Sequence, residues 1–424
     1  MLRKLLQVFK IPDLRRKVLI VASLLVGFRF MAAIPMPGID TARLADLFAS
    51  NQLLGFLNLF SGGALDSLSI MMLGVGPYIT ATIVMQLLTM IFPAMKAMYQ
   101  EEGEQGRAKF NRFSRYLTVP LAALQSYGFL TLLNQQGVFT EFTFASVMTN
   151  VIVAVAGSMV LVWLGELISE QKIGNGISLL IFAGIVSGLP QIIRTSLITY
   201  DPSTLPTYIA FILLSIVVIA GVAFVTEGER KIPVSYAKRI RGTKMIGGVS
   251  SYLPLRVNQA GVIPIIFAIS IMLFPQFLAQ MSMIISPEFG TWFNEWVTYL
   301  FNNQFIYGVS YFFLVVVFTY FYTSVTFDPK EIAGNLQRSG GFVPGIRPGE
   351  PTREFIAKIV NRITLFGALF LGTIAILPII TQALTGIQTL TLGGTALLIV
   401  VSVALESMKQ IDSQLVMREY EGIQ

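Results

Sequence analysis

The sequence predicts an all-α polytopic membrane protein with ten transmembrane helices. Hydrophobic residues make up 54% of the 424 residues, and the mean hydropathy is +0.70. Charged residues make up 12%, about half the fraction that soluble domains usually carry. The apolar residues also gather in windows of about 20, the length that a helix needs to cross the hydrocarbon core of a bilayer.

Ten such windows occur along the chain, separated by polar or basic segments. An even number of spans places both termini on the same side of the membrane. The windows are residues 18–34, 71–92, 116–133, 147–168, 177–194, 208–226, 260–284, 304–325, 363–384 and 391–408.

The basic residues lie almost entirely on one side of this topology. Of the 30 Lys and Arg residues, 27 fall in the N-terminal segment, the C-terminal tail and the loops 93–115, 169–176, 227–259 and 326–362. Loops rich in Lys and Arg remain in the cytoplasm, so we expect this face and both termini to be cytoplasmic. Arg29 falls inside the first span, where we interpret it as a paired or snorkelling structural residue.

Two of the basic loops, 227–259 and 326–362, are longer than topology alone requires. Contact with anionic lipid would explain the sign of their charge but not their length. Gly and Pro recur in both, for example at Gly247, Gly340 and Pro344, which is typical of ordered, turn-rich loops. We therefore expect docking sites for a large, anionic cytoplasmic partner.

The segment before the second span is neither a span nor an ordinary loop. Ser61, Gly62, Gly63 and Asp66 interrupt it too often for a lipid-facing helix, although it is rich in Leu and Phe. Irregular backbone at membrane depth survives only where protein or a water-filled cavity covers it. Together with the early glycines of the second span, this pattern predicts a broken helix that lines and stops a pore.

The second and seventh spans open with similar motifs, Gly74-Val75-Gly76-Pro77-Tyr78-Ile79 and Gly261-Val262-Ile263-Pro264-Ile265-Ile266. These spans hold equivalent places in two five-span halves, residues 1–200 and 201–424, which insert with opposite orientation. Matching Gly- and Pro-interrupted spans indicate a central site at the interface of the repeats.

Several other function classes have little support in the composition. The chain has no Cys and no His, so thiol chemistry, histidine bases and most metal sites are absent, and we expect no metal, cofactor or catalytic residue. A glycine-rich phosphate loop with Lys is also missing. An ion-coupled transporter is the main alternative, but it would normally place acidic residues or His at mid-membrane, whereas Glu166 and Glu406 fall near span ends. In the loop 285–303, Trp292, Trp296 and Tyr299 are expected to be interfacial aromatics.

Motifs along nearly the whole chain resemble those of the SecY family, the channel-forming subunits of the bacterial Sec protein translocon. The residues that carry the resemblance are Phe60-Ser61-Gly62-Gly63-Ala64-Leu65, Gly74 to Ile79, Trp163-Leu164-Gly165-Glu166, Ile173-Gly174-Asn175-Gly176-Ile177-Ser178, Tyr236-Ala237-Lys238-Arg239, the run from Ala260 to Pro264, Gly340 to Gly349, and Gly393-Gly394-Thr395.

The resemblance implies a clamshell of two inverted halves around an hourglass pore, and it assigns roles to individual residues. The implied aliphatic pore ring is Val75, Ile79, Ile181, Ile266, Leu397 and Ile399. The implied plug spans about 58–69 and includes Asn58, Phe60, Ser61, Gly62, Gly63, Leu65, Asp66 and Ser69. Spans two and three facing seven and eight would form a lateral gate that carries Gln86 and Gln125. The periodicity of these residues along the spans would, by itself, equally fit ordinary packing between helices.

The resemblance also implies partners and a location. Lys238, Arg239 and Arg347 would dock the motor ATPase SecA or the ribosome, the latter through its RNA. Other implied partners are the small subunits SecE and SecG, signal sequences, nascent chains and anionic phospholipids, in the bacterial plasma membrane. Two positions depart from the family pattern. Val75 replaces the commoner Ile, which we expect to loosen the seal slightly, and Asp328 stands where Asn is frequent.

Overall fold

The computed structural model describes residues 10–37, 68–135, 137–139, 143–198, 205–236, 239–241, 244–246, 250–385 and 388–421. The helices in these ranges are α2 (Pro12–Ala32), α5 (Gly76–Ile91), α6 (Pro93–Gln100), α7 (Gly103–Gln135), α8 (Phe144–Glu170), α9 (Gly176–Ile198), α10 (Leu205–Glu227), α11 (Ile263–Ile285), α12 (Pro287–Asn302), α13 (Gln304–Thr326), α14 (Pro329–Arg338), α15 (Glu350–Thr385) and α16 (Gln388–Glu421). The strands are β1 (Glu229–Tyr236), β2 (Arg239–Arg241), β3 (Lys244–Ile246), β4 (Ser250–Arg256) and β5 (Gly341–Phe342).

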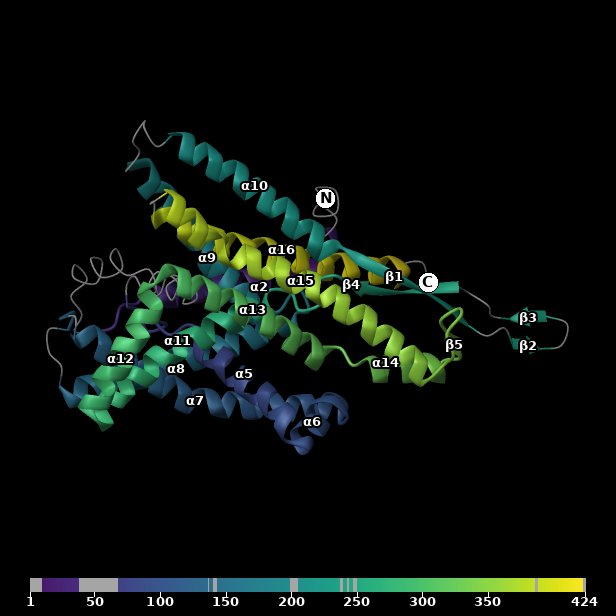
Figure 1. Cartoon of the computed structure of the whole chain (residues 1–424), viewed down its shortest axis with the longest axis horizontal. Helices are drawn as coiled ribbons and strands as arrows, with labels where there is room; N and C mark the ends of the chain where they lie inside the picture. The colour runs from purple at the N-terminus through teal and green to yellow at the C-terminus, as the bar shows by residue number, and fades with distance from the viewer. Residues whose placement is uncertain are drawn as a thin grey trace.

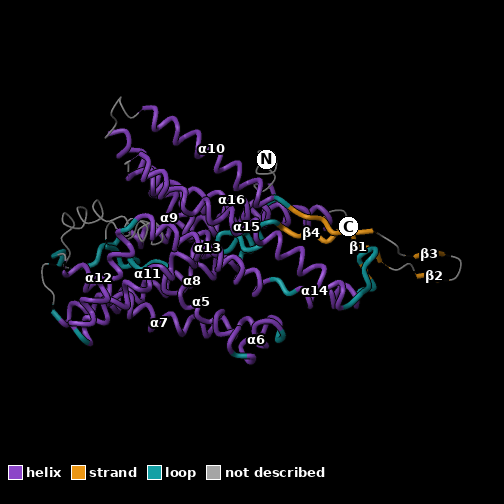
Figure 2. Tube along the Cα trace, in the orientation of Figure 1, coloured by secondary structure: helices purple, strands orange, loops and turns teal. Residues whose placement is uncertain are grey.

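Each of the ten predicted windows coincides with a helix, namely α2, α5, α7, α8, α9, α10, α11, α13, α15 and α16. Figure 1 shows that these helices run roughly along the long axis of the molecule, and Figure 2 shows the strands gathered at one end. Because every predicted window is helical, the predicted ten-helix architecture holds.

In the described ranges, five of the helices are individually long and apolar enough to cross a membrane, or six if the bent pair α5–α6 counts as one span.

Several helices extend well beyond the apolar windows. α7 and α15 each begin 13 residues before their windows, and α16 continues to Glu421. Between them, α6 leaves α5 at an angle of 117°. The bend lies at Phe92, whose extended backbone precedes Pro93, as expected because Pro disfavours helical conformation in the residue before it.

The second and seventh spans begin with the same local backbone. Gly74 and Gly261 both have positive φ, 57° and 62°, a conformation that glycine adopts without a steric penalty. The next residues are N-caps with nearly equal angles, φ −91° and ψ 3° at Val75 and φ −95° and ψ −7° at Val262. Pro then occupies the first turn of each helix, which supports the structural equivalence inferred from the two motifs.

The two long basic loops form one ordered unit at the end of the molecule that carries the strands. β1 pairs antiparallel with β4 from the same loop and with β5 from the other, giving the order β4-β1-β5. A separate small core stabilises the unit by burying apolar side chains from both loops and from the start of α15. Its buried members are Ile232, Leu255, Val343, Ile356, Ile359 and Val360. The parts of these loops that the structure describes are therefore ordered, as predicted.

Two smaller expectations receive a structural account. Asp328 is the N-cap of α14, and its side chain accepts a hydrogen bond of 2.8 Å from the backbone N–H of Lys330, a role that Asn performs equally well. In α12, Trp292, Trp296 and Tyr299 are 53%, 54% and 60% exposed. Their positions on a helix between two spans are those expected of interfacial aromatics.

Candidate pore and seal

The residues directly before α5 are held between α7 and α8. Leu68 and Met72 are buried with Leu130 and Ala154 in a cluster of their own. A backbone hydrogen bond of 2.9 Å runs from the N–H of Met36 to the carbonyl of Leu68, and one of 3.1 Å from the N–H of Ile70 to that of Ile34.

These two bonds join the ends of the segment 38–67. The plug positions Asn58, Phe60, Ser61, Gly62, Gly63, Leu65 and Asp66 lie outside the described residues. Ser69, the last residue of the predicted plug, is fully buried in this junction, and its hydroxyl accepts a hydrogen bond of 3.2 Å from the N–H of Met71.

A close approach of α8 fixes the position of this turn. A Cβ added to Gly157 would lie 2.0 Å from the carbonyl oxygen of Ile70, so no larger residue fits there without a backbone shift. The turn continues with a hydrogen bond of 2.8 Å from the N–H of Gly74 to the carbonyl of Met71. The turn therefore presents Val75 and the start of α5 at a defined depth in the helix bundle.

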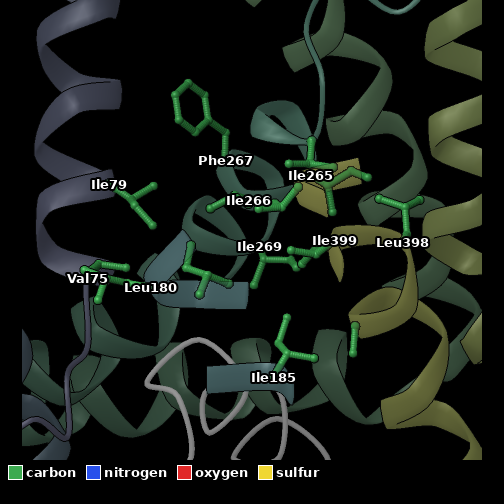
Figure 3. Packing of buried hydrophobic residues seen from close by; sticks show 14 of the residues in the cluster. Val75, Ile79, Leu180, Ile185, Ile265, Ile266, Phe267, Ile269, Leu398 and Ile399 are labelled. Carbon is green, nitrogen blue, oxygen red and sulfur yellow. The ribbon is translucent and has the colours of Figure 1, made fainter. Parts of the chain in front are cut away.

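Five of the six predicted ring residues meet in the main hydrophobic core. Val75, Ile79, Ile181, Ile266 and Ile399 are each between 1% and 6% exposed and belong to one cluster. They come from the start of α5, from α9, from α11 and from α16. Figure 3 shows Val75 and Ile79 on one side of the cluster, with Ile266 and Ile399 across from them and Ile266 directed toward Ile79.

The sixth predicted ring residue does not join this cluster. Leu397 is only partly buried, whereas its neighbours Leu398 and Ile399 are buried within the cluster. Helical geometry explains the difference, because residues two apart on a helix face different directions. The motif match could place α16 at the centre but could not by itself choose its inward face.

One further residue shares the environment of the ring but was missed. Ile185 is 2% exposed, belongs to the same cluster and lies one helical turn after Ile181 on α9. Figure 3 shows it below Ile269. The spacing i, i+4, which also relates Val75 to Ile79, could have identified it from the sequence.

The two predicted gate glutamines are buried on adjacent helices. Gln86 on α5 is 6% exposed and Gln125 on α7 is 8% exposed. The side-chain amide of Gln125 donates to the hydroxyl of Thr80 over 3.4 Å, while the Oε1 atom of Gln86 has no hydrogen-bond partner in the described residues. Both helices contact α11, and α11 packs against α13, so α11 lies where the two sides of the predicted gate would meet.

Of the three predicted docking residues, Arg347 is described with its side chain and lies in the ordered loop unit. Arg347 is exposed in the turn after β5, and its carbonyl accepts a hydrogen bond of 2.8 Å from the hydroxyl of the buried Thr352. Arg239 begins β2, and its side chain, like the whole of Lys238, lies outside the described part of the chain.

Charged residues near the spans have interaction partners within the chain. Glu166 of α8 forms an ion pair of 3.0 Å with Arg115 of α7, and both side chains are about one-third exposed, 33% and 39%. Arg29 is exposed in the last turn of α2 and has an interaction partner within the chain, as the structural interpretation of this residue requires.

Comparison with known proteins identifies the family. A SecY family model matches residues 69–408. The chain belongs to the SecY family. The protein translocase subunit SecY of Streptomyces coelicolor is 41% identical over 100% of this chain and 99% of its own length. The family is one of membrane-spanning channel subunits, which sets aside the transporter alternative.

Solved structures of SecY-like channels share the fold. A structure described as showing that the plug domain of SecY stabilises the closed state of the translocation channel aligns with a TM-score of 0.65 and 22% identity, over 94% of this chain and 92% of that one. Canine Sec61, in a ribosome–channel complex from the endoplasmic reticulum, aligns with a TM-score of 0.61 and 22% identity over the same shares.

Proposed function

We propose that this SecY-family chain forms a protein-conducting channel in a bacterial plasma membrane, with both termini cytoplasmic. Unfolded secretory polypeptides would cross between the halves 1–200 and 201–424, and transmembrane segments would leave sideways into the lipid. The observation that carries the proposal is the convergence of Val75, Ile79, Ile181, Ile266 and Ile399 from four helices of both halves.

An aliphatic constriction suits this task for physical reasons. A translocating chain exposes backbone amides, each of which costs several kcal/mol if it enters hydrocarbon unpaired, so the route must be aqueous. A narrow hydrophobic ring prevents ion leakage because it excludes water when no cargo is present. Its aliphatic side chains offer no hydrogen bonds, so cargo of any sequence can slide past them.

The ring that we propose differs at one position from the ring that the sequence motifs imply, because we choose buried residues of the central cluster. It comprises Val75, Ile79, Ile181, Ile185, Ile266 and Ile399, with Ile185 in place of Leu397. Burial of all six supports a sealed waist in the resting channel. The segment of about 58–69 is proposed as the plug, because the junction of its last residues, Leu68 and Ser69, with α7 and α8 would return it to the same place after displacement.

The proposed gate opens between α5 with α7 on one side and α11 with α13 on the other. Gln86 and Gln125 give this seam a polar character that a signal sequence would encounter as it leaves. The unpaired Oε1 atom of Gln86 supports this role, because a buried polar atom without a partner weakens the closed seam.

The partners proposed for this chain are those of a translocon. SecE and SecG would contact it within the membrane, and anionic phospholipids would surround it. The SecA motor or the ribosome would dock on the ordered basic loops through Lys238, Arg239 and Arg347. The cargo comprises signal sequences and nascent chains.

The function is tested by reconstituting the purified chain with SecE and SecG in vesicles. With SecA and ATP outside, an unfolded secretory polypeptide should become protected from added protease, and the same polypeptide without its signal sequence should remain digestible. Uptake of small solutes without any protected polypeptide would instead favour a transporter.

A further inference from the structure

A basic pocket lies where α15 meets the base of the β1–β4 hairpin. Its volume is about 600 Å³, and its charged lining comprises Arg230, Lys358, Arg362 and Glu229. Figure 1 shows the two elements beside each other, close to the point where α10 continues into β1. Three cations therefore share one hollow with a single carboxylate.

The pocket is held in shape by backbone contacts at its base. The N–H of Val257, after β4, donates to the carbonyl of Gly228 over 2.8 Å. A Cβ added to Gly367 of α15 would lie 2.9 Å from the carbonyl oxygen of Val257, so α15 rests directly on the hairpin base. These contacts hold α15 against the hairpin base from which the pocket is built.

The lining of the pocket changes from charged to apolar along one ridge of α15. Lys358, Arg362 and Phe366 are four residues apart and so lie on the same helix face. The apolar span of this helix begins at residue 363. Arg362 therefore lies directly before the hydrocarbon boundary and Lys358 about one turn further toward the loop, while Phe366 lies inside the boundary and is 57% exposed.

The charges of the pocket are not neutralised by one another. Within the described residues, no ion pair closer than 4 Å involves Arg230, Lys358, Arg362 or Glu229. Exposed cations at the membrane surface, without bound counter-ions, attract anionic headgroups, and each cation adds to the attraction. The apolar base, which includes Ile359 and Ile363, continues this site toward the bilayer.

We propose that this pocket binds one anionic phospholipid. Its phosphate would lie among Arg230, Lys358 and Arg362, and an acyl chain would lie along Phe366. A nucleic-acid phosphate would satisfy the cations equally well, but it would leave the apolar base and the exposed Phe366 without a function. This inference refines the general lipid contact within the proposed function, and it concerns binding rather than translocation.

The proposal is tested on the full chain, purified in detergent and stripped of lipid. Native mass spectrometry after titration with cardiolipin or phosphatidylglycerol measures the affinity, with phosphatidylcholine as the zwitterionic reference. We expect the double substitution Lys358→Gln and Arg362→Gln to weaken binding of the anionic lipids by about tenfold or more, because two headgroup contacts are lost. Phosphatidylcholine binding should not change.

A matched control removes the same charge elsewhere on the same face. Lys231 and Lys330 are exposed and lie outside the pocket, so changing both to Gln should leave anionic lipid binding within about twofold of the unmodified chain. Glycerol phosphate, which carries the headgroup charge but no acyl chains, should not compete. The single variant Lys358→Gln supplies the comparison if the double variant does not fold.

Two outcomes would overturn the proposal. The first is equal lipid binding by the pocket variant and the unmodified chain. The second is effective competition by glycerol phosphate, which would identify a soluble phosphate site. Neither of these results depends on whether the chain translocates polypeptides.

Discussion

Replacing Val75 and Ile79 together with Gly is expected to raise the resting ion conductance of the reconstituted channel by about tenfold or more. Both side chains are almost fully buried in the central cluster, and their removal would leave a cavity in the proposed ring. A constriction that excludes water by its apolar lining conducts once it is wide enough to stay wet. Planar-bilayer recording measures the effect, and polypeptide translocation should persist.

A matched pair on α16 sharpens this test. Ile399→Gly removes a buried cluster residue, whereas Leu397→Gly makes the same chemical change at a partly buried residue outside the cluster. Both cost the helix about 1 kcal/mol of propensity, so a loss of helix stability alone would affect both variants equally. We expect only Ile399→Gly to leak. Equal conductance of the two variants would contradict the proposed ring.

The plug makes a separate contribution to the seal. Deleting residues 58–67 should also raise the resting conductance, and it should leave the junction at Leu68 and Ser69 intact. Deleting as far as residue 69 would break that junction as well, so the shorter deletion separates loss of the plug from distortion of the turn that presents Val75.

Arg347→Glu is expected to reduce SecA-driven translocation by about tenfold or more. The side chain is exposed on a turn whose backbone is held by Thr352, so the substitution should reverse a surface charge without disturbing the fold. An anionic docking surface would then meet a like charge, which costs far more than the loss of one attraction. Protease protection of cargo in reconstituted vesicles measures the rate.

The control for this variant is Lys330→Glu. Lys330 is exposed on α14 in the same loop and carries the same charge, so both variants change the net charge equally. We expect near-normal translocation in the control. If both variants were equally slow, the loop would act through its overall charge, and Arg347 would lose its assigned role.

The spans could be predicted from the sequence because a helix needs about 20 consecutive apolar residues to cross the hydrocarbon core of a bilayer. Hydropathy could not show that α7 and α15 begin well before their windows, since a polar helical extension looks like a loop in such a profile. The sheet that joins the two basic loops was also invisible, because the pairing of β1 with β5 joins segments about 100 residues apart. Such contacts depend on the tertiary fold rather than on local sequence.

The membership of the central cluster could be predicted only in part, and the differences have geometric causes. The shared motif of the second and seventh spans predicted Val75 and Ile266, and both lie in the central cluster. The motif is informative because positive φ at the preceding glycine requires a particular sequence. On α9 and α16 no such constraint exists, so Ile185 was missed and Leu397 was chosen although it lies outside the cluster. The inward face of an evenly apolar helix is decided by its neighbours.

The central claim is that polypeptide passes through the waist formed by α5, α9, α11 and α16. It is tested most directly by stalling a secretory chain part-way and placing a photo-crosslinking residue at position 79, 181 or 266, with position 216 on the exposed face of α10 as the control. The account predicts crosslinks to the stalled chain from all three core positions and none from 216. Crosslinks from 216 alone, or from none of the core positions, would contradict it.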